Sequence, residues 1–219
     1  MKKLMNRTML ASLIGAAVLL PTAAFADVSA NAGVTTNYLW RGMEQTDGGP
    51  AISGGFDYSN ESGFYVGTWA SNVDFGDADI ELDLYGGFTG KVGDWDYDVG
   101  YILFMYPGSD SDFNFGEVYS NFSKGALTLG LAALANADAD GADFGDSIYV
   151  SADYAFALSN DFELGLHVGS YTGDFTPNGD AIDLGVTVSK DSWLVGLTKV
   201  DQGDDDVKLY ASYSLEFDL

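Results

Sequence analysis

Hydrophobic and polar residues alternate along most of this chain after residue 26. In the run D-I-E-L-D-L-Y-G-G-F at 79–88, carboxylates and aliphatic side chains take alternate positions over the first six residues. Because successive side chains of a β-strand point to opposite faces, a period of two predicts a strand with one apolar and one polar face. No window shows a sustained helical period, and no stretch of 18 apolar residues is present to form a membrane helix. The chain is therefore predicted to be all-β.

The same alternation recurs about twelve times, with turn signals between the runs. The expected strands lie at about 30–41, 51–58, 63–73, 79–88, 95–105, 113–122, 127–133, 148–156, 162–168, 182–188, 192–200 and 207–219. In the sixth run the alternation changes phase near Gly116, which indicates a β-bulge. Short turns and longer acidic loops are expected to alternate between the strands without exception.

An even number of strands with connections sorted by length is typical of an antiparallel up-and-down barrel in a bacterial outer membrane. The short turns and both termini of such a barrel lie in the periplasm, and the longer loops lie outside. A soluble sandwich or barrel would also alternate, but it would not need loops sorted by side. Aromatic residues near the strand ends fit girdles at the two membrane interfaces, and these are Tyr38, Trp40, Phe56, Tyr58, Trp95, Phe156, Phe162, Trp193 and Phe217.

The first 26 residues have the pattern of a secretory signal peptide. They open on basic residues, continue with an apolar run over 9–20 and end on A-F-A at 24–26. We expect this segment to be removed, which leaves residues 27–219 as one barrel domain exported through the periplasm. The chain has no cysteine, so it has neither a disulfide framework nor a thiolate metal site.

The expected mature chain is strongly acidic. The whole sequence has 9 Lys and Arg against 33 Asp and Glu, and three of the basic residues lie in the predicted signal peptide. Six basic against 33 acidic residues leave a formal charge of −27. Such a surface repels nucleic acid and anionic headgroups and attracts cations, so a nucleic-acid partner is not expected.

The stretch from residue 37 to residue 73 carries a resemblance to a known family. It contains N-Y-L-W-R-G at 37–42, E-Q-T at 44–46, P-A-I-S-G-G-F-D-Y at 50–58 and S-G-F-Y-V-G-T-W-A-S-N-V at 62–73. These motifs resemble the TorF-like porin family, also called Gcw_chp. The resemblance implies an outer-membrane barrel with porin activity in a Gram-negative proteobacterium, and it implies no particular substrate.

The expected environment follows from this outer-membrane location. The barrel would contact outer-membrane lipid and lipopolysaccharide, and the outer-membrane assembly machinery would insert it. That machinery usually reads an aromatic residue at the end of the chain, whereas this sequence ends F-D-L, with Leu219 in the last outward position.

If the aliphatic faces of the strands meet lipid, the polar faces line a lumen. The predicted pore-lining residues are Arg41, Asp57, Glu81, Asp83, Asp96, Asp98, Glu117, Asp153, Glu163, Asp183, Lys208 and Glu216. Eight-stranded barrels are filled by side chains and sixteen-stranded barrels hold open channels, and twelve strands are intermediate. Many inward positions are small, so we expect a narrow watery path biased toward cations. The alternative is a lumen plugged by tyrosines with hydrogen-bonded carboxylates, the candidates being Tyr85, Tyr149, Tyr171 and Tyr210.

Arg41 is the only arginine of the expected mature chain, and its position in the alternation places it inside, at the end of the first strand. Opposite an acidic wall it would either narrow the path, by bidentate pairing with a carboxylate, or clamp the structure by offsetting carboxylate repulsion.

Two further features have weaker chemical patterns. His167 is the only histidine, but no nucleophile motif accompanies it, so we expect neither an enzyme nor a cofactor. The loop N-A-D-A-D-G-A-D at 136–143 resembles the front of a calcium loop through Asp138, Asp140 and Asp143, but it lacks the distal glutamate. Loosely bound Ca²⁺, or cations shared with lipopolysaccharide, would suit it.

The sequence thus predicts a porin-like channel for small cations or small polar solutes. The alternative is a non-conducting barrel that acts through its acidic loops, in adhesion, divalent-cation binding or envelope stabilisation.

Overall fold

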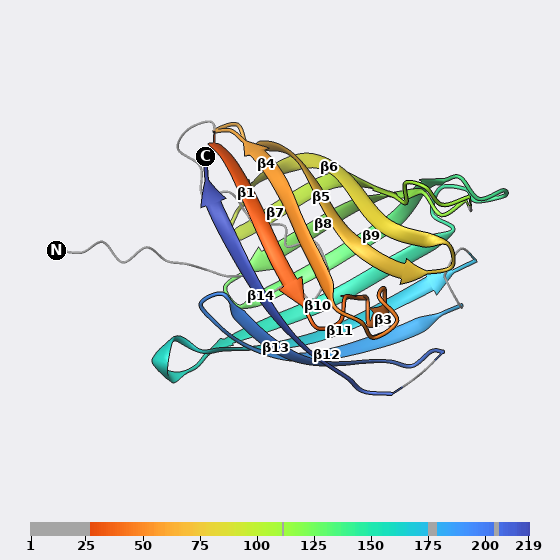
Figure 1. Ribbon diagram of the computed structural model, residues 1–219. Coiled ribbons are helices and arrows are strands. Elements are labelled where there is room, and N and C mark those ends of the chain that lie inside the picture. The colour runs from red at the N-terminus through yellow and green to blue at the C-terminus, as the bar shows by residue number, and fades with distance from the viewer. Residues whose placement is uncertain (1–26, 111, 175–178, 204–205) are drawn as a thin grey trace.

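The computed structural model describes residues 27–110, 112–174, 179–203 and 206–219 and shows a closed antiparallel barrel (Figure 1). Each barrel strand pairs with its neighbour along the chain, and β1 closes the ring by pairing with both β4 and β14. The predicted signal peptide lies outside the described residues. Among these residues, no helix has the length and apolar composition needed to cross a bilayer.

The predicted twelve-stranded barrel is confirmed. Its strands are β1 Asp27–Thr35, β4 Ala51–Ser59, β5 Phe64–Phe75, β6 Ala78–Val92, β7 Trp95–Met105, β8 Phe115–Lys124, β9 Leu127–Ala137, β10 Ser147–Ala157, β11 Glu163–Gly173, β12 Ala181–Lys190, β13 Trp193–Val200 and β14 Lys208–Asp218. The described chain also contains a 3₁₀ turn, Ser159–Asp161, and two short strands, β2 Leu39–Trp40 and β3 Met43–Glu44.

The two ends of the barrel differ in their connections. At the terminal end, where β1 begins and β14 finishes, all five connections are short, at 60–63, 93–94, 125–126, 158–162 and 191–192. At the opposite end, here called the loop end, five of the six are longer: 36–50, 106–114, 138–146, 174–180 and 201–207. The sixth, Gly76–Asp77, contradicts the expected strict alternation. Gly76 has a φ of 60°, a left-handed conformation that glycine adopts without steric cost and that lets β5 and β6 meet in a tight turn.

The outward face of the barrel is apolar. Large hydrophobic side chains are exposed around the ring, among them Val34, Ile52, Phe56, Val66, Leu84, Val99, Val118, Leu129, Val150, Val168, Val186, Leu197 and Leu209. A soluble monomer rarely exposes a continuous apolar surface of this kind. The inward face instead contains carboxylates, tyrosines and a cluster of buried aromatic residues near the loop end. This inside-out distribution follows from the alternation in the sequence.

A β-bulge lies beside Gly116, close to the predicted position, but its extra residue belongs to β9 and not to β8, the sixth predicted strand. The pairing of β8 with β9 shifts between Gly116 and Glu117, and Ala135 of β9 is left without a partner. The register of β8 with β7 is unbroken at this point, so Glu117 keeps the phase of Phe115 and Tyr119, and its side chain is buried in the lumen.

The first strand is shorter than predicted. It ends at Thr35, and residues 36–50, here called the inward hairpin, leave the wall and turn into the barrel. Figure 1 shows the short β2–β3 pair at the end of the barrel away from the C-terminus. Tyr38 and Trp40 were predicted to form part of an interfacial girdle, and this is wrong because they are only 6% and 9% exposed within the barrel. The alternation misled because β2 continues the period of two after the chain has left the wall.

Candidate functional site: a hairpin across the lumen

The inward hairpin reverses direction at Arg41 and Gly42. Leu39 pairs with Glu44 and Trp40 pairs with Met43, which leaves a two-residue tip. Both tip residues have positive φ, 49° for Arg41 and 78° for Gly42, as a type I′ turn requires. Glycine adopts this conformation freely, but for arginine it costs about 1–3 kcal/mol, so other contacts must hold Arg41 in place.

Glu117 on β8 supplies the strongest of these contacts. The two terminal nitrogens of Arg41 donate to the two carboxylate oxygens of Glu117 at 2.8 and 2.6 Å, and the side chains are 4% and 3% exposed. Such a bidentate pair fixes orientation as well as distance. Burial alone would lower the pKa of Arg41, but the neighbouring carboxylate raises it above its ordinary value, so the guanidinium remains charged.

Aromatic rings enclose the same guanidinium. Its central carbon lies 4.2 Å from the ring centres of Trp40 and Tyr149 and 4.8 Å from that of Tyr171. Cation–π contacts of this kind gain strength when water is excluded. Sequence reasoning placed Arg41 in the lumen opposite an acidic wall. The structure places it there too, but on a folded-in loop instead of a barrel strand.

The start of the inward hairpin is attached to the wall formed by β5, β6 and β7. The hydroxyl of Tyr38 donates to one oxygen of Glu81 at 2.7 Å, and the hydroxyl of Tyr106 donates to the other at 3.2 Å. The ring of Tyr38 also packs edge-on against Trp69, with centres 5.5 Å apart. Trp40 also packs against aromatic rings. Its ring centre lies 5.9–6.0 Å from those of Phe104, Phe115 and Tyr171.

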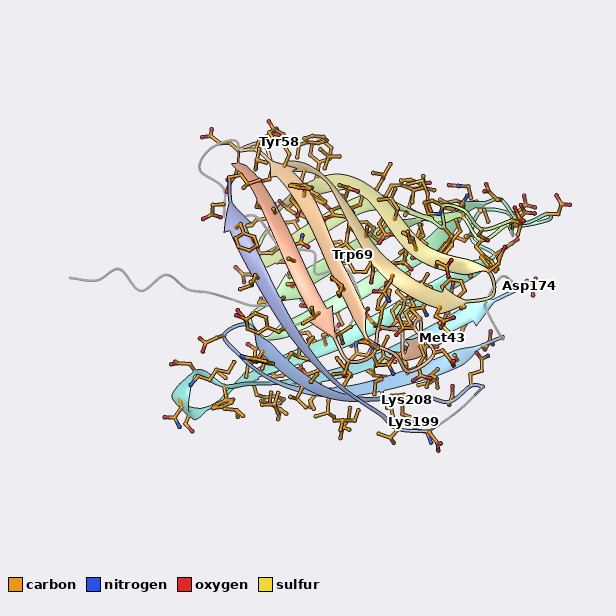
Figure 2. The ribbon with its side chains drawn as sticks, viewed as in Figure 1. Met43, Tyr58, Trp69, Asp174, Lys199 and Lys208 are labelled. Atoms are coloured by element: carbon orange, nitrogen blue, oxygen red, sulfur yellow. The ribbon has the colours of Figure 1, made fainter. Side chains whose placement is uncertain are left out.

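The tip of the hairpin reaches the other side of the barrel. A Cβ atom at Gly42 would lie 3.0 Å from the Cβ atoms of Asp183 on β12 and Val200 on β13. Lys208 of β14 contacts Glu44 of the hairpin at 3.4 Å. On the near side, the backbone N–H of Asp74 in β5 donates to the carbonyl of Gln45 at 2.7 Å. In Figure 2, Met43 of the hairpin lies toward the loop end, away from Tyr58 at the terminal end. The inward hairpin therefore spans the lumen near the loop end.

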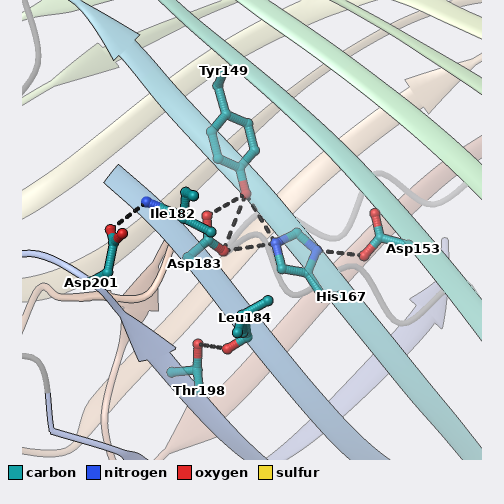
Figure 3. A network of polar contacts seen from close by, with 8 residues as sticks. All are labelled: Tyr149, Asp153, His167, Ile182, Asp183, Leu184, Thr198 and Asp201. Carbon is teal, nitrogen blue, oxygen red and sulfur yellow. Dashed lines mark hydrogen bonds and ion pairs between the residues drawn. The ribbon is translucent and has the colours of Figure 1, made fainter. Parts of the chain in front are cut away.

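A polar network continues from this site into the wall formed by β10, β11 and β12 (Figure 3). The two ring nitrogens of His167 lie 2.7 Å from carboxylate oxygens of Asp153 and Asp183. Tyr149, whose ring faces Arg41, brings its hydroxyl to 3.0 Å from both His167 and Asp183. Both ring nitrogens of His167 are thus engaged by carboxylates, an arrangement that suits a structural wall residue.

Tyrosines also fill the lumen beyond the hairpin. The hydroxyl of Tyr85 donates to Asp57 at 2.5 Å, and that of Tyr65 donates to Asp98 at 2.6 Å. Small inward residues were expected to leave an open path, but tyrosine rings occupy much of that space. A Cβ atom at Gly67 would lie within 3.0 Å of Tyr85, and the ring of Tyr210 covers Gly196 in the same way. Several lumen glycines therefore make room for rings, as in the predicted alternative of a tyrosine-filled lumen.

The structure divides the predicted pore-lining residues into two groups. One lies within the barrel and consists of Arg41, Asp57, Glu81, Asp83, Asp98, Glu117, Asp153 and Asp183. The other lies near the barrel ends. Asp96 forms a short ion pair with Lys91, Glu163 begins β11, Lys208 begins β14 and Glu216 is exposed near the end of β14. Sequence reasoning missed the lumen aromatics Tyr65, Trp69, Phe104 and Tyr106, although the last two share the inward phase of Asp96 and Asp98.

The acidic loop 138–146 gives the calcium prediction no support. Asp138 accepts a hydrogen bond from Asn114 at 2.7 Å, and the backbone of Asp143 donates to Asp146 at 2.7 Å. Within the described ranges, no group of three or more acidic or histidine side chains is arranged to hold a metal ion.

The comparison with protein families agrees with the resemblance seen in the sequence. The model described as "Bacterial protein of unknown function (Gcw_chp)" matches residues 21–217. The chain belongs to the Gcw_chp family. The match does not confirm the TorF-like name, and a comparison of the Gcw_chp chain with curated proteins finds no match.

Solved structures share the fold of this Gcw_chp protein at low sequence identity. The KdgM porin has a TM-score of 0.55 at 10% identity, and the match covers 87% of this chain and 98% of the porin. KdgM porin in complex with disordered oligogalacturonate gives 0.56 at 9% identity with the same coverage. A structure from work on in-meso crystallization of membrane proteins gives 0.59 at 8%, covering 88% of this chain and 84% of that one. These likenesses establish a porin-like barrel fold.

Proposed function

We propose that this Gcw_chp protein is an outer-membrane porin-like channel in which the inward hairpin forms the constriction, and that it passes small cations by passive diffusion. One observation carries the proposal. Arg41 and Glu117 pin a loop across an acidic lumen inside a barrel whose outer face is apolar. A loop that crosses the lumen determines what can pass. The non-enzymatic role fits the contacts of His167, which join it to two carboxylates and a phenol.

The expected surroundings belong to the same proposal. The exposed apolar face would contact outer-membrane lipid in a Gram-negative bacterium, with the terminal end in the periplasm and the acidic loops toward lipopolysaccharide. The outer-membrane assembly machinery would insert the barrel after export.

The preference for cations rests on the charges inside the barrel. Arg41 is matched by Glu117, and His167 lies between two carboxylates. Asp57 receives hydrogen bonds from a phenol and an amide, and Glu81 from two phenols, so neither has a cationic partner among the described residues. An acidic lining favours cations. KdgM porin, which shares only the fold, has been solved in complex with disordered oligogalacturonate, an anionic sugar, and we infer a solute of different charge here.

Reconstitution in a planar bilayer tests this function. The purified full-length barrel should produce discrete conductance steps, and a salt gradient should give a reversal potential of the sign expected for a cation-preferring channel. A boiled sample of the same preparation is the control for detergent artefacts. Absence of steps at every salt concentration would rule the channel out.

A non-conducting barrel is the second candidate, and the filling of the lumen by the hairpin and the tyrosines favours it. In that case the protein acts through its outer loops, where Phe144 is 71% exposed in loop 138–146. Deleting this loop should then abolish adhesion or envelope stabilisation, and no bilayer current should appear with or without the loop. Conductance steps in the wild type would exclude this candidate.

A further inference from the structure

Two carboxylates on β6 are buried side by side without a cation. Glu81 and Asp83 occupy alternate positions of the strand, so both point into the lumen about 7 Å apart along the backbone. They are 2% and 1% exposed, which places them among the most buried side chains of the described barrel. Buried charges require partners, because taking them out of water is costly.

The partners of this pair leave its charge unbalanced. Glu81 receives two phenol hydrogen bonds, from Tyr38 and Tyr106. Asp83 is less well satisfied, because its Oδ1 atom is buried without any hydrogen-bond partner. The ion pairs seen in the described part of the chain include neither residue. A buried acceptor that no protein group satisfies can take a bond from a cation or from another donor.

We propose that Glu81 and Asp83 form a binding site for a hard divalent cation such as Ca²⁺. The four carboxylate oxygens and the phenol oxygens of Tyr38 and Tyr106 make a patch of six oxygen atoms. Ca²⁺ takes six to eight oxygen ligands in flexible geometry, and its charge matches two carboxylates. Because Tyr38 belongs to the inward hairpin, the cation would join the hairpin to the wall beside β6. The site does not depend on conduction and would exist in a non-conducting barrel as well.

Other lumen carboxylates fit this role less well. Asp57 accepts hydrogen bonds from Tyr85 and Asn31 at its two carboxylate oxygens. Asp183 lies against His167, and Glu117 is already paired with Arg41. Asp98 also has a buried oxygen without a hydrogen-bond partner, its Oδ2 atom, but the next carboxylate on the same face of β7, Asp96, is partly exposed and paired with Lys91. Of these lumen carboxylates, the β6 pair alone combines two adjacent buried carboxylates with an acceptor that lacks a partner.

Terbium luminescence provides a direct probe of the site. Tb³⁺ replaces Ca²⁺ at oxygen-rich sites and emits when a nearby indole or phenol is excited, and Trp69 packs against Tyr38 beside Glu81. The full-length protein is refolded in detergent with Tb³⁺ present, so that the ion can reach a buried site. Wild-type protein should show sensitised emission that excess Ca²⁺ removes.

Two variants with the same change in charge separate the buried site from the acidic surface. Asp83→Asn should weaken Tb³⁺ binding at least tenfold. Asp138→Asn, in the acidic loop, should leave the sensitised emission unchanged. Glu81→Gln is the second test if Asp83→Asn does not give the heat-dependent gel shift of a folded barrel.

The outcomes distinguish the site from the channel. Emission that survives in both Asp83→Asn and Glu81→Gln, or wild-type protein without sensitised emission, would overturn the site and indicate a shared proton or water in its place. Bilayer conductance is measured on the same preparations. Conductance without Tb³⁺ binding would reject only the cation site, and Tb³⁺ binding without conductance would reject only the channel.

Discussion

Two buried acidic positions meet the inward hairpin, and they are satisfied in different ways. Glu117 on β8 receives a bidentate guanidinium from Arg41, whereas Glu81 on β6 receives only phenol hydroxyls and stands next to Asp83. The first contact balances charge and holds the tip of the hairpin. The second leaves negative charge inside the barrel. The comparison suggests that one position anchors the constriction while the other determines which ions are drawn to it.

The largest effect is expected from removing the charge of Glu117. In Glu117→Gln, Arg41 is left as a buried cation without a counterion, which costs about 3–5 kcal/mol and should release the hairpin from the lumen. Arg41 is the only arginine after residue 26, so an arginine-specific protease reports its exposure by a single cut. Wild-type protein should resist cleavage, and Glu117→Gln should be cut rapidly. Glu61→Gln, at an exposed turn of the terminal end, is the control of equal charge. Equal resistance of all three proteins would contradict the anchoring role.

A smaller effect is expected at the Glu81 contact. Tyr38→Phe removes a hydrogen bond to a charged group, a loss of about 1.5–3 kcal/mol, and should allow slow cleavage at Arg41. Tyr106→Phe removes the longer hydrogen bond to the same carboxylate from a residue outside the hairpin and is the matched control. Cleavage should be faster in Tyr38→Phe than in Tyr106→Phe. The reverse order would show that the hairpin is not held through Tyr38.

The contact of the tip with β12 and β13 can be tested at a glycine. In Gly42→Ala, the new methyl group meets Asp183 and Val200 at 3.0 Å, and overpacking of this kind costs about 1–3 kcal/mol. Gly48→Ala lies in the same hairpin at a similar φ of 73°, but its nearest neighbour is 3.5 Å away. Both variants bear the cost of a positive φ, so the difference between them in protease resistance isolates the contact. Gly42→Ala should therefore be cleaved faster at Arg41 than Gly48→Ala.

The smallest effect is expected on ion preference. Asp83→Asn removes one lumen charge, without altering the Arg41–Glu117 pair, and should lower the cation-to-anion permeability ratio roughly twofold, equivalent to about 0.4 kcal/mol. Reversal potentials in a salt gradient measure this ratio. Asp138→Asn in the outer loop should change it less. A larger change in the loop variant would place the selectivity outside the lumen.

Much of the barrel could be predicted from the sequence because its wall follows a strict period of two. The strand count and the inward carboxylates came from that pattern. The apparent change of phase near Gly116 has another cause, because Phe113 and Phe115 pack inside the barrel and the bulge lies in β9. The hairpin could not be recognised in the same way, because Tyr38 and Trp40 continue the alternation after β1 has ended. The partner of Arg41 was also hidden, since Glu117 lies 76 residues away and only closure of the barrel brings the two together.

The filling of the lumen by tyrosine rings also could not be predicted from the sequence. Inward glycines such as Gly67 and Gly196 indicated open space because each was considered without its neighbours on adjacent strands. Their neighbours on adjacent strands, Tyr85 and Tyr210, lay their rings over them. Which ring covers which glycine depends on register between strands, and the sequence alone does not give that register.

Single-channel conductance with and without the inward hairpin tests the central claim most directly. Residues 37–47 are replaced by a short Gly-Ser linker, which leaves the barrel strands intact, and both proteins are reconstituted under the same salt. If the hairpin forms the constriction, the variant should show steps several-fold larger than the wild type while the acidic wall keeps its preference for cations. Equal conductance of the two proteins would contradict the proposed constriction.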